Sequence, residues 1–188
     1  MTPDEILKDA KQRMDKAIEH LQAELRGVRT GRASPALIEY VKVDYYGSPT
    51  DLKALAAISV PEPTQLLVSP FDATAVSEIK KAIEAADLGL NPQVEGKQIR
   101  IRIPDLTTER RKQLAAHVKK LGEEAKVAVR NIRRDANKHL DAIKKDKDAH
   151  ISEDAIEDMK KDVQDLLKQH EERIDELVGE KNREIMEV

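Results

Sequence analysis

The stretch that decides the fold is EEAKVAVRNIRRDANKHL, residues 123–140. Its apolar residues recur at steps of three and four, which is the spacing of one face of an α-helix. They are Ala125, Val129, Ile132, Ala136 and Leu140. A second face carries polar side chains at similar steps: Lys126, Arg130, Arg133 and Asn137, with Arg134 beside them. We therefore expect a long helix that packs other helices on one face and presents a basic face on another.

Two interpretations of the basic face are open on pattern alone. Guanidinium groups one turn apart repel each other unless an anion lies between them, and each offers a planar fork of donors suited to phosphate and base edges. A charged helix face is, however, often only solvated, and Asp135 could pair with one of the arginines. The clustering of Arg130, Arg133 and Arg134 supports RNA as a partner, but the pattern alone leaves a solvated face as the more common case.

Composition limits the class of protein. Of the 188 residues, 37% are charged and only 2% are aromatic, which indicates long solvated helices rather than an aromatic core. The apolar fraction of 39% is too high for a disordered chain. The absence of cysteine excludes disulfides and thiolate chemistry, and fits a reducing compartment. Neither a signal peptide nor an apolar run long enough to span a membrane is present, so we expect a cytoplasmic protein with no membrane partner.

Two further helices are predicted, one before and one after the long central helix. Residues 3–30 carry a heptad-like apolar stripe, with Thr2 as the N-cap and Gly31 as a left-handed stop. The long central helix runs from about residue 107 to the polar turn at 146–150. A third helix begins after Ser152, another N-cap residue. Three such stripes imply a three-helix bundle.

The middle of the chain has a different composition. Residues 32–104 contain seven of the eight prolines and all four aromatic residues. Residues 40–45, 55–60, 65–69, 88–90 and 98–103 have the pattern of strands, residues 47–50 that of a turn, and residues 73–86 that of a helix. These elements predict a small α+β domain inserted between the helices.

The predicted fold class is therefore α+β, with two domains. Residues 1–30 and 105–188 form a discontinuous, elongated three-helix bundle, and residues 31–104 form the inserted domain. The chain crosses between them twice, and each crossing contains Gly or Pro, which favours hinge motion and a bent molecule. The predicted hinge residues are Thr30, Gly31, Arg32, Ile103, Pro104 and Asp105.

Charge separates the last two helices. Residues 107–147 contain 13 Lys and Arg against 6 Asp and Glu, a net charge of +7. Residues 148–188 contain 6 against 14, a net charge of −8. Part of this difference is expected to be attraction within the bundle, and the remainder gives the molecule a basic side. The acidic helix is most simply a solvated face, although a docking surface for a protein partner is an alternative.

No pattern supports catalysis, a cofactor or a metal site. The five histidines do not cluster, and the HEERI run at 170–174 has Ile174 where a second zinc ligand would stand. His170 lies on the apolar stripe and is predicted to be a packed core histidine. Glycine fingerprints for phosphate or dinucleotide binding are absent. The four aromatic residues are predicted to form a small core and its rim rather than a base-stacking platform.

Six motifs, in order along the whole chain, resemble the bacterial ribosome recycling factor family. They are RTGRASP at 29–35, VDYYGSPT at 43–50, DLGLNP at 87–92, LTTERRK at 106–112, VAVRNIRRDAN at 127–137 and ISED at 151–154. One departure is Thr108, where the family commonly has an acidic residue; it affects a helix start.

The resemblance implies an L-shaped protein of transfer-RNA-like dimensions, with a three-helix bundle and a β/α/β sandwich domain. It implies a monomeric translation factor, not an enzyme, that acts with elongation factor G after termination. The pair splits the ribosome into subunits, releasing messenger RNA and deacylated transfer RNA, while the elongation factor hydrolyses GTP. In the family the bundle lies on large-subunit ribosomal RNA through arginines that correspond here to Arg130, Arg133 and Arg134.

The predicted RNA-binding set is thus Lys126, Arg130, Arg133, Arg134 and Asn137. Further RNA contacts are expected from Arg29, Arg32, Arg110 and Arg111, although Arg29 and Arg32 could equally be explained by the negative end of the first helix. The alternative function is a non-enzymatic, helical-bundle scaffold or chaperone-like module that engages proteins. Salt dependence separates the two, because phosphate contacts weaken steeply with salt.

Overall fold

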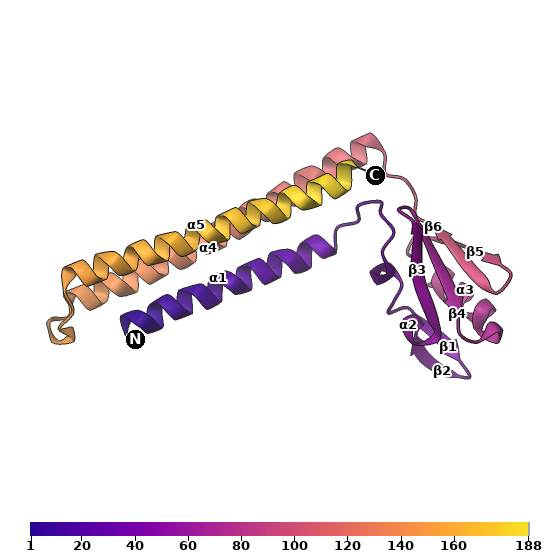
Figure 1. Ribbon diagram of the computed structural model, residues 1–188, viewed down its shortest axis with the longest axis horizontal. Helices are drawn as coiled ribbons and strands as arrows, with labels where there is room; N and C mark the ends of the chain where they lie inside the picture. Colours follow the sequence, from indigo (N-terminus) through magenta and orange to yellow (C-terminus); the bar gives the residue numbers. More distant parts are fainter. Residues whose placement is uncertain (188) are drawn as a thin grey trace. The chain divides into compact units, whose positions relative to one another are not determined.

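The computed structural model describes residues 1–187, which form two compact units (Figure 1). Unit 1 comprises Met1–Val28 and Glu109–Met186, and unit 2 comprises Arg29–Thr108 together with Glu187. Unit 1 is helical, whereas unit 2 combines strands with short helices. The fold class is α+β, as the sequence predicts.

Unit 1 contains three long helices: α1 (Pro3–Arg26), α4 (Thr108–Lys145) and α5 (Glu153–Met186). They lie side by side, with α1 and α5 running in one direction and α4 in the other (Figure 1). A 3₁₀ turn, η3 (Lys147–Ala149), lies between α4 and α5. The two predicted N-caps are confirmed. Thr2 forms a reciprocal capping box with Glu5, and Ser152 Oγ accepts a hydrogen bond from the Ala155 amide.

The core of unit 1 follows the predicted stripes. On α4, the five residues of the predicted stripe within 123–140 are all buried, whereas Val127, outside the stripe, is exposed. Gly122 is also buried, because α5 approaches so closely there that a Cβ would lie 2.5 Å from Val178 Cγ2. His170 is a buried histidine, as predicted. Its Nδ1 lies 2.7 Å from the Leu166 carbonyl oxygen and its Nε2 lies 2.7 Å from Asp15 Oδ1, so it also links α5 to α1.

The predicted end of the first helix is wrong. The stripe suggested a helix to residue 30, stopped by Gly31, but α1 ends at Arg26 and is capped by Gly27. Gly27 has a right-handed φ of −74°, and its amide donates to the Glu24 carbonyl. Glycine is an unfavourable residue within a helix. Two residues further on, Arg29 is the first residue of unit 2, and its side chain donates to the Leu88 carbonyl within that unit. Gly31 does adopt a left-handed φ of 78°, but beyond the helix.

Unit 2 contains a hairpin, a four-stranded sheet and short helices. The hairpin is β1 (Lys42–Tyr45) with β2 (Ser48–Asp51), and the antiparallel sheet has the order β3-β4-β6-β5. Its strands are β3 (Ala56–Glu62), β4 (Gln65–Pro70), β5 (Asn91–Glu95) and β6 (Gln98–Arg102). The helical segments are η1 (Pro35–Leu37), α2 (Leu52–Leu55), η2 (Ala73–Ala75) and α3 (Val76–Ala85).

One aliphatic core joins these layers of unit 2. Val43 of the hairpin, Ile79 and Ile83 of α3, and Leu66 and Ile99 of the sheet belong to the same buried cluster. Alternate residues of β4 and β6 point into it, as expected for a sheet covered on one face. The arrangement is a β/α/β sandwich.

Three details of unit 2 differ from the sequence prediction. Residues 88–90 form no strand; the strand there is β5. The turn lies at Tyr46 and Gly47, both with positive φ as a two-residue hairpin loop requires, and not at 47–50. The aromatic residues contribute less to the core than predicted: Tyr45 packs against the buried cluster, whereas Tyr40, Tyr46 and Phe71 are exposed, because aliphatic residues already fill the small core.

Candidate nucleic-acid interface

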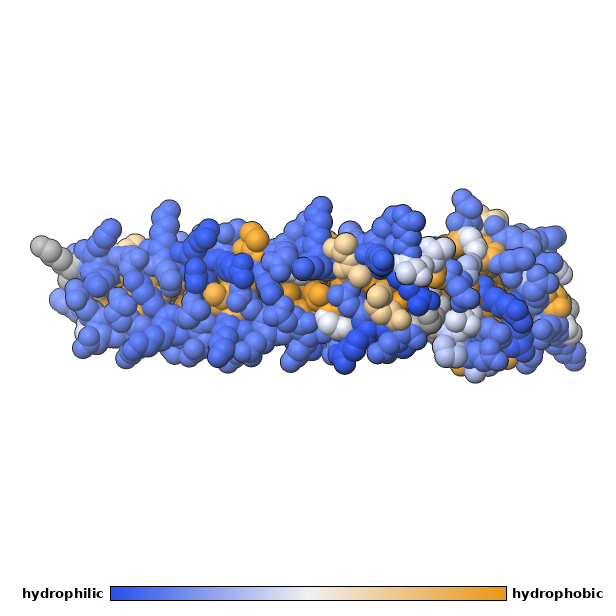
Figure 2. Space-filling model, turned by 90° about the horizontal axis from the view of Figure 1, so that it is seen from above, coloured by the Kyte–Doolittle hydropathy of each residue, from blue (hydrophilic) through white to orange (hydrophobic). Residues whose placement is uncertain are grey.

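The outer face of α4 carries an open groove of about 500 Å³ in its second half. We call it the basic groove; its lining residues are Arg133, Arg134, Asn137, Lys138, Asp141, Ala142 and Lys145. All come from one helix at steps of three and four, so they share one face. Four of them are cations and one is a carboxylate, so the lining has a net positive charge. On the face of the molecule that Figure 2 shows, the surface is largely hydrophilic, with scattered apolar patches.

The predicted RNA-binding residues fall into two groups. Arg133, Arg134 and Asn137 line the basic groove. Lys126 and Arg130 instead pair with carboxylates of α5. Lys126 Nζ lies 2.7 Å from Asp175 Oδ1, and Arg130 Nε lies 2.6 Å from Glu171 Oε1. The sequence places opposite net charges on α4 and α5, and these two ion pairs are contacts between those charges.

The Lys126 pair is the more enclosed of the two. The Lys126 side chain is only 17% exposed. The hydrogen bond to Asp175 raises the pKa of Lys126 above its usual value, since the bond favours the charged form. Arg130 remains 44% exposed and keeps part of its guanidinium accessible to a partner.

Arg133 is anchored but not fully bonded. Its Nη1 donates to Gln164 Oε1 of α5 at 3.1 Å, which fixes the guanidinium against the bundle. Its Nε and the Oδ1 of Asn137, one turn later, are both buried and have no hydrogen-bond partner within the described residues. Buried polar atoms are usually bonded. The two therefore hold unused hydrogen-bonding capacity beside the basic groove.

The geometry suits an anionic polymer better than a small-molecule substrate. The groove is open along the helix, and its cations are spread over about three helical turns of roughly 5.4 Å each. Guanidinium and ammonium groups in such a row bind phosphates without reading sequence. The groove contains no histidine or hydroxyl group that could act in catalysis.

Comparison with known proteins identifies the family. The family model described as "Ribosome recycling factor" matches residues 21–186. The ribosome-recycling factor of Bacillus licheniformis is 50% identical over 184 residues, which cover 98% of each chain. The chain belongs to the ribosome recycling factor family.

Two solved structures of family members show the same fold. A solution structure of the ribosome recycling factor has a TM-score of 0.77 at 41% identity, covering 100% of this chain and 99% of the other. A second structure is also 41% identical, with a TM-score of 0.62, covering 99% of this chain and all of the other. It represents the Thermus thermophilus (T. thermophilus) factor and Escherichia coli (E. coli) elongation factor G bound to the E. coli post-termination complex.

The additional arginines that resemble family positions are engaged locally. Arg29 donates to the Leu88 carbonyl at 2.9 Å, and Arg32 lies 3.9 Å from the Glu187 carboxylate. Arg110 donates to Gln113 Oε1 at 3.1 Å, one turn along α4, and Arg111 is half-buried. None of the four lines the basic groove.

The segments predicted as the hinge lie close to the limits of unit 2. Thr30 is buried, whereas Arg32, Pro104 and Asp105 are exposed. Next to each segment, one backbone bond reaches the turn between β3 and β4: the Ala33 amide donates to Pro63, and the Ile103 amide donates to Thr64, both at 2.7 Å. The two chain crossings are thus anchored to neighbouring residues of a single turn.

Sequence reasoning missed Lys138 and Lys145, which complete the basic groove. Their signal was present, because they follow Arg134 by four and eleven residues, which are helical spacings. Within residues 1–187, no three metal-binding side chains come together. The helices of that same range include none long and apolar enough to cross a membrane.

Proposed function

We propose that this protein, together with elongation factor G and GTP, separates the post-termination ribosome into subunits, and so releases messenger RNA and deacylated transfer RNA. It does so as a monomer in the cytoplasm and without catalysis of its own. Family membership and the related factor seen with elongation factor G on a post-termination complex support this proposal.

In this proposal, α4 anchors the bundle on large-subunit ribosomal RNA. The observation that carries the assignment is the basic groove, in which four cations and one carboxylate share a single helix face. Arg133, Arg134 and Asn137 make the main contacts, with Arg133 the most important, because its guanidinium is already held by Gln164 and so loses little freedom on binding. Arg130 and Lys126 contribute less, since their carboxylate partners on α5 compete with phosphate.

The hinge has a separate role in the proposal. Elongation factor G displaces unit 2 while unit 1 stays on the large subunit. Rotation occurs at residues 30–32 and 103–105, which are short, contain Gly or Pro, and flank the anchoring bonds to the β3–β4 turn. Two connections side by side restrict the motion to few directions. Arg29, Arg32, Arg110 and Arg111, near these connections, supply secondary RNA contacts.

The anchoring step is tested by binding to purified large ribosomal subunits at several salt concentrations. Arg133→Ala and Arg134→Ala should each weaken binding and lower the salt slope by about one, as expected for the loss of one phosphate contact. Lys120→Ala removes a positive charge from the same helix outside the groove and should bind nearly as wild type. Circular dichroism should show that all three variants keep their helicity, because Arg134 and Lys120 are exposed and Arg133 makes a single side-chain hydrogen bond to α5.

The proposal would be refuted by equal effects of Arg133→Ala and Lys120→Ala, or by wild-type binding that is insensitive to salt. The complete function is tested by a subunit-splitting assay on post-termination ribosomes. Splitting should require this protein, elongation factor G and GTP together. A bundle that binds proteins and not ribosomes would instead give no splitting and no salt-dependent binding.

A further inference from the structure

Asp141 is the one carboxylate among the residues that line the basic groove, and it lies on the same face as the cations. A bare carboxylate there would repel phosphate. It would also attract Lys138 and Lys145, which lie one turn away on either side at positions where helix side chains pair. The groove would therefore attract an anion more strongly if this charge were neutralised from elsewhere.

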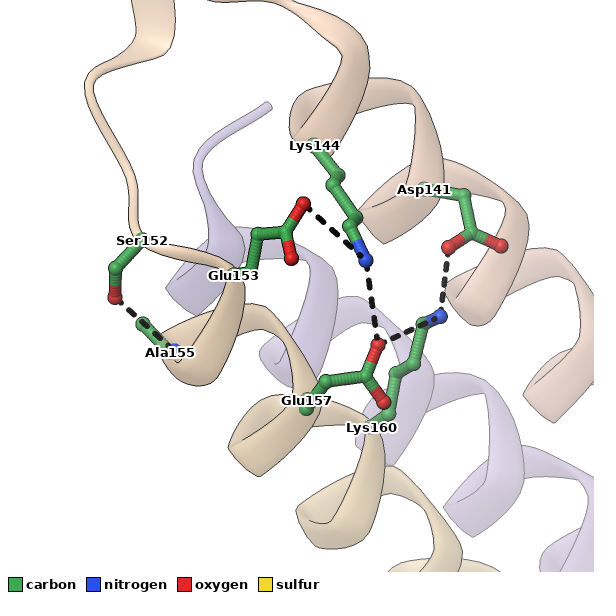
Figure 3. Close-up of polar contacts among 7 residues, drawn as sticks. All are labelled: Asp141, Lys144, Ser152, Glu153, Ala155, Glu157 and Lys160. Atoms are coloured by element: carbon green, nitrogen blue, oxygen red, sulfur yellow. Dashed lines mark hydrogen bonds and ion pairs between the residues drawn. The ribbon is translucent and has the colours of Figure 1, made fainter.

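Lys160 of α5 supplies the neutralising charge. Its Nζ lies 2.6 Å from Asp141 Oδ1, across the interface between the two helices (Figure 3). The Lys160 side chain is only 24% exposed, so the ammonium group is held at the helix contact and not in free solution. The bond also lowers the pKa of Asp141 and raises the pKa of Lys160, so both remain charged and paired at neutral pH.

Further charges keep Lys160 in place. Glu157, one turn earlier on α5, lies 3.6 Å from the Lys160 ammonium group. Lys144 of α4 lies 3.8 Å from both Glu153 and Glu157, so it draws these carboxylates towards α4 (Figure 3). The result is a chain of alternating charges that ends at Asp141, beside the groove.

We propose that Lys160 is a positioning residue for RNA binding: it neutralises Asp141 from α5 and thereby leaves the cations of the basic groove free for phosphate. This inference rests on the proposed function, because it concerns the same groove. Lys160 does not line the groove, but through its ion pair with Asp141 a residue of the acidic helix α5 would influence RNA binding.

A pair of substitutions separates this role from ordinary bundle stability. Lys160→Gln and Asp141→Asn both break the same ion pair, so a purely structural role would change binding in the same direction. If Lys160 acts by neutralising Asp141, the two substitutions should instead change the binding affinity in opposite directions. Lys160→Gln exposes the carboxylate and should weaken binding to purified large ribosomal subunits by about threefold, the effect of one unit charge a few ångströms away in water. Asp141→Asn should tighten binding by a similar factor.

Two measurements complete the test. The double variant Lys160→Gln/Asp141→Asn should bind as wild type, because the carboxylate and its counter-charge are both absent. Circular dichroism on each variant should confirm that the helices are intact. Shifts of the two single variants in the same direction, unchanged binding, or a double variant as weak as Lys160→Gln would overturn the inference while leaving the proposed function standing. Failure of the wild type to bind would overturn both.

Discussion

Replacing Gly122 by alanine would test whether α4 and α5 pack as closely as the structure indicates. The added methyl group would lie 2.5 Å from Val178 Cγ2 and 3.8 Å from Ile174 Cγ2. Valine is β-branched and stiff about χ1, so it cannot simply rotate away. Overpacking of this kind costs about 1–3 kcal/mol. Alanine in place of a helical glycine returns about 1 kcal/mol, so the net loss in the free energy of unfolding is about 0–2 kcal/mol.

Gly179, in α5, provides a matched control. A Cβ at this position would meet no atom within 4 Å, so Gly179→Ala should gain about 1 kcal/mol from helix propensity alone. The two variants should therefore differ by about 1–3 kcal/mol. Urea unfolding followed by far-ultraviolet circular dichroism measures the difference, because most of the helical signal comes from unit 1.

A second substitution makes the reasoning specific to Val178. In the Gly122→Ala background, Val178→Ala removes the colliding methyl groups and should cost less than it does in the wild type. This coupling identifies direct contact. Equal gains from Gly122→Ala and Gly179→Ala, or additive effects of Gly122→Ala and Val178→Ala, would show that the helices are not in close contact at Gly122.

Two further predictions concern the stability of α1. Lys11 and then His170 bond to Asp15 and lower its pKa below the usual 3.8, so its stabilising effect is present above that pH and is lost as the pH falls through the lowered value. Urea midpoints of wild type and Asp15→Asn should thus differ at neutral pH and converge in acid; a constant difference would contradict this. Thr2→Ala, which removes the capping box, should cost about 1 kcal/mol, whereas Thr2→Ser should retain the box and most of the stability in the same assay.

Helical periodicity predicted the bundle well because burial in a long helix repeats with the helical turn. The buried residues Val129, Ile132 and Ala136 are those that the pattern selects. The end of α1 could not be predicted in this way. The pattern continues to Val28, but the chain stops being helical at Gly27, and Arg29, the first residue of unit 2, donates to the Leu88 carbonyl within that unit. That contact spans 59 positions in the sequence, and no local pattern contains it.

The candidate site was predictable in part for the same reason. Arg133, Arg134 and Asn137 share a face by helical geometry alone, and the structure places them in one groove. Which of the neighbouring cations are already paired depends on how α4 is rotated relative to α5. Lys126 and Arg130 have the same spacing in the sequence as the groove residues, yet they face Asp175 and Glu171. Only the packing of the two helices distinguishes these groups.

The order of the helices along the chain has a consequence for how the protein is made. Unit 1 needs both α1 and α5, and Met186, at the end of α5, lies 160 positions after Arg26, at the end of α1. At about 5–20 residues per second, α1 leaves the ribosome roughly 8–30 s before its partner is complete. Unit 2, which is nearly continuous in the sequence, can fold during that time. During that interval the 24 residues of α1 lack α5, the helix against which they pack in the folded protein.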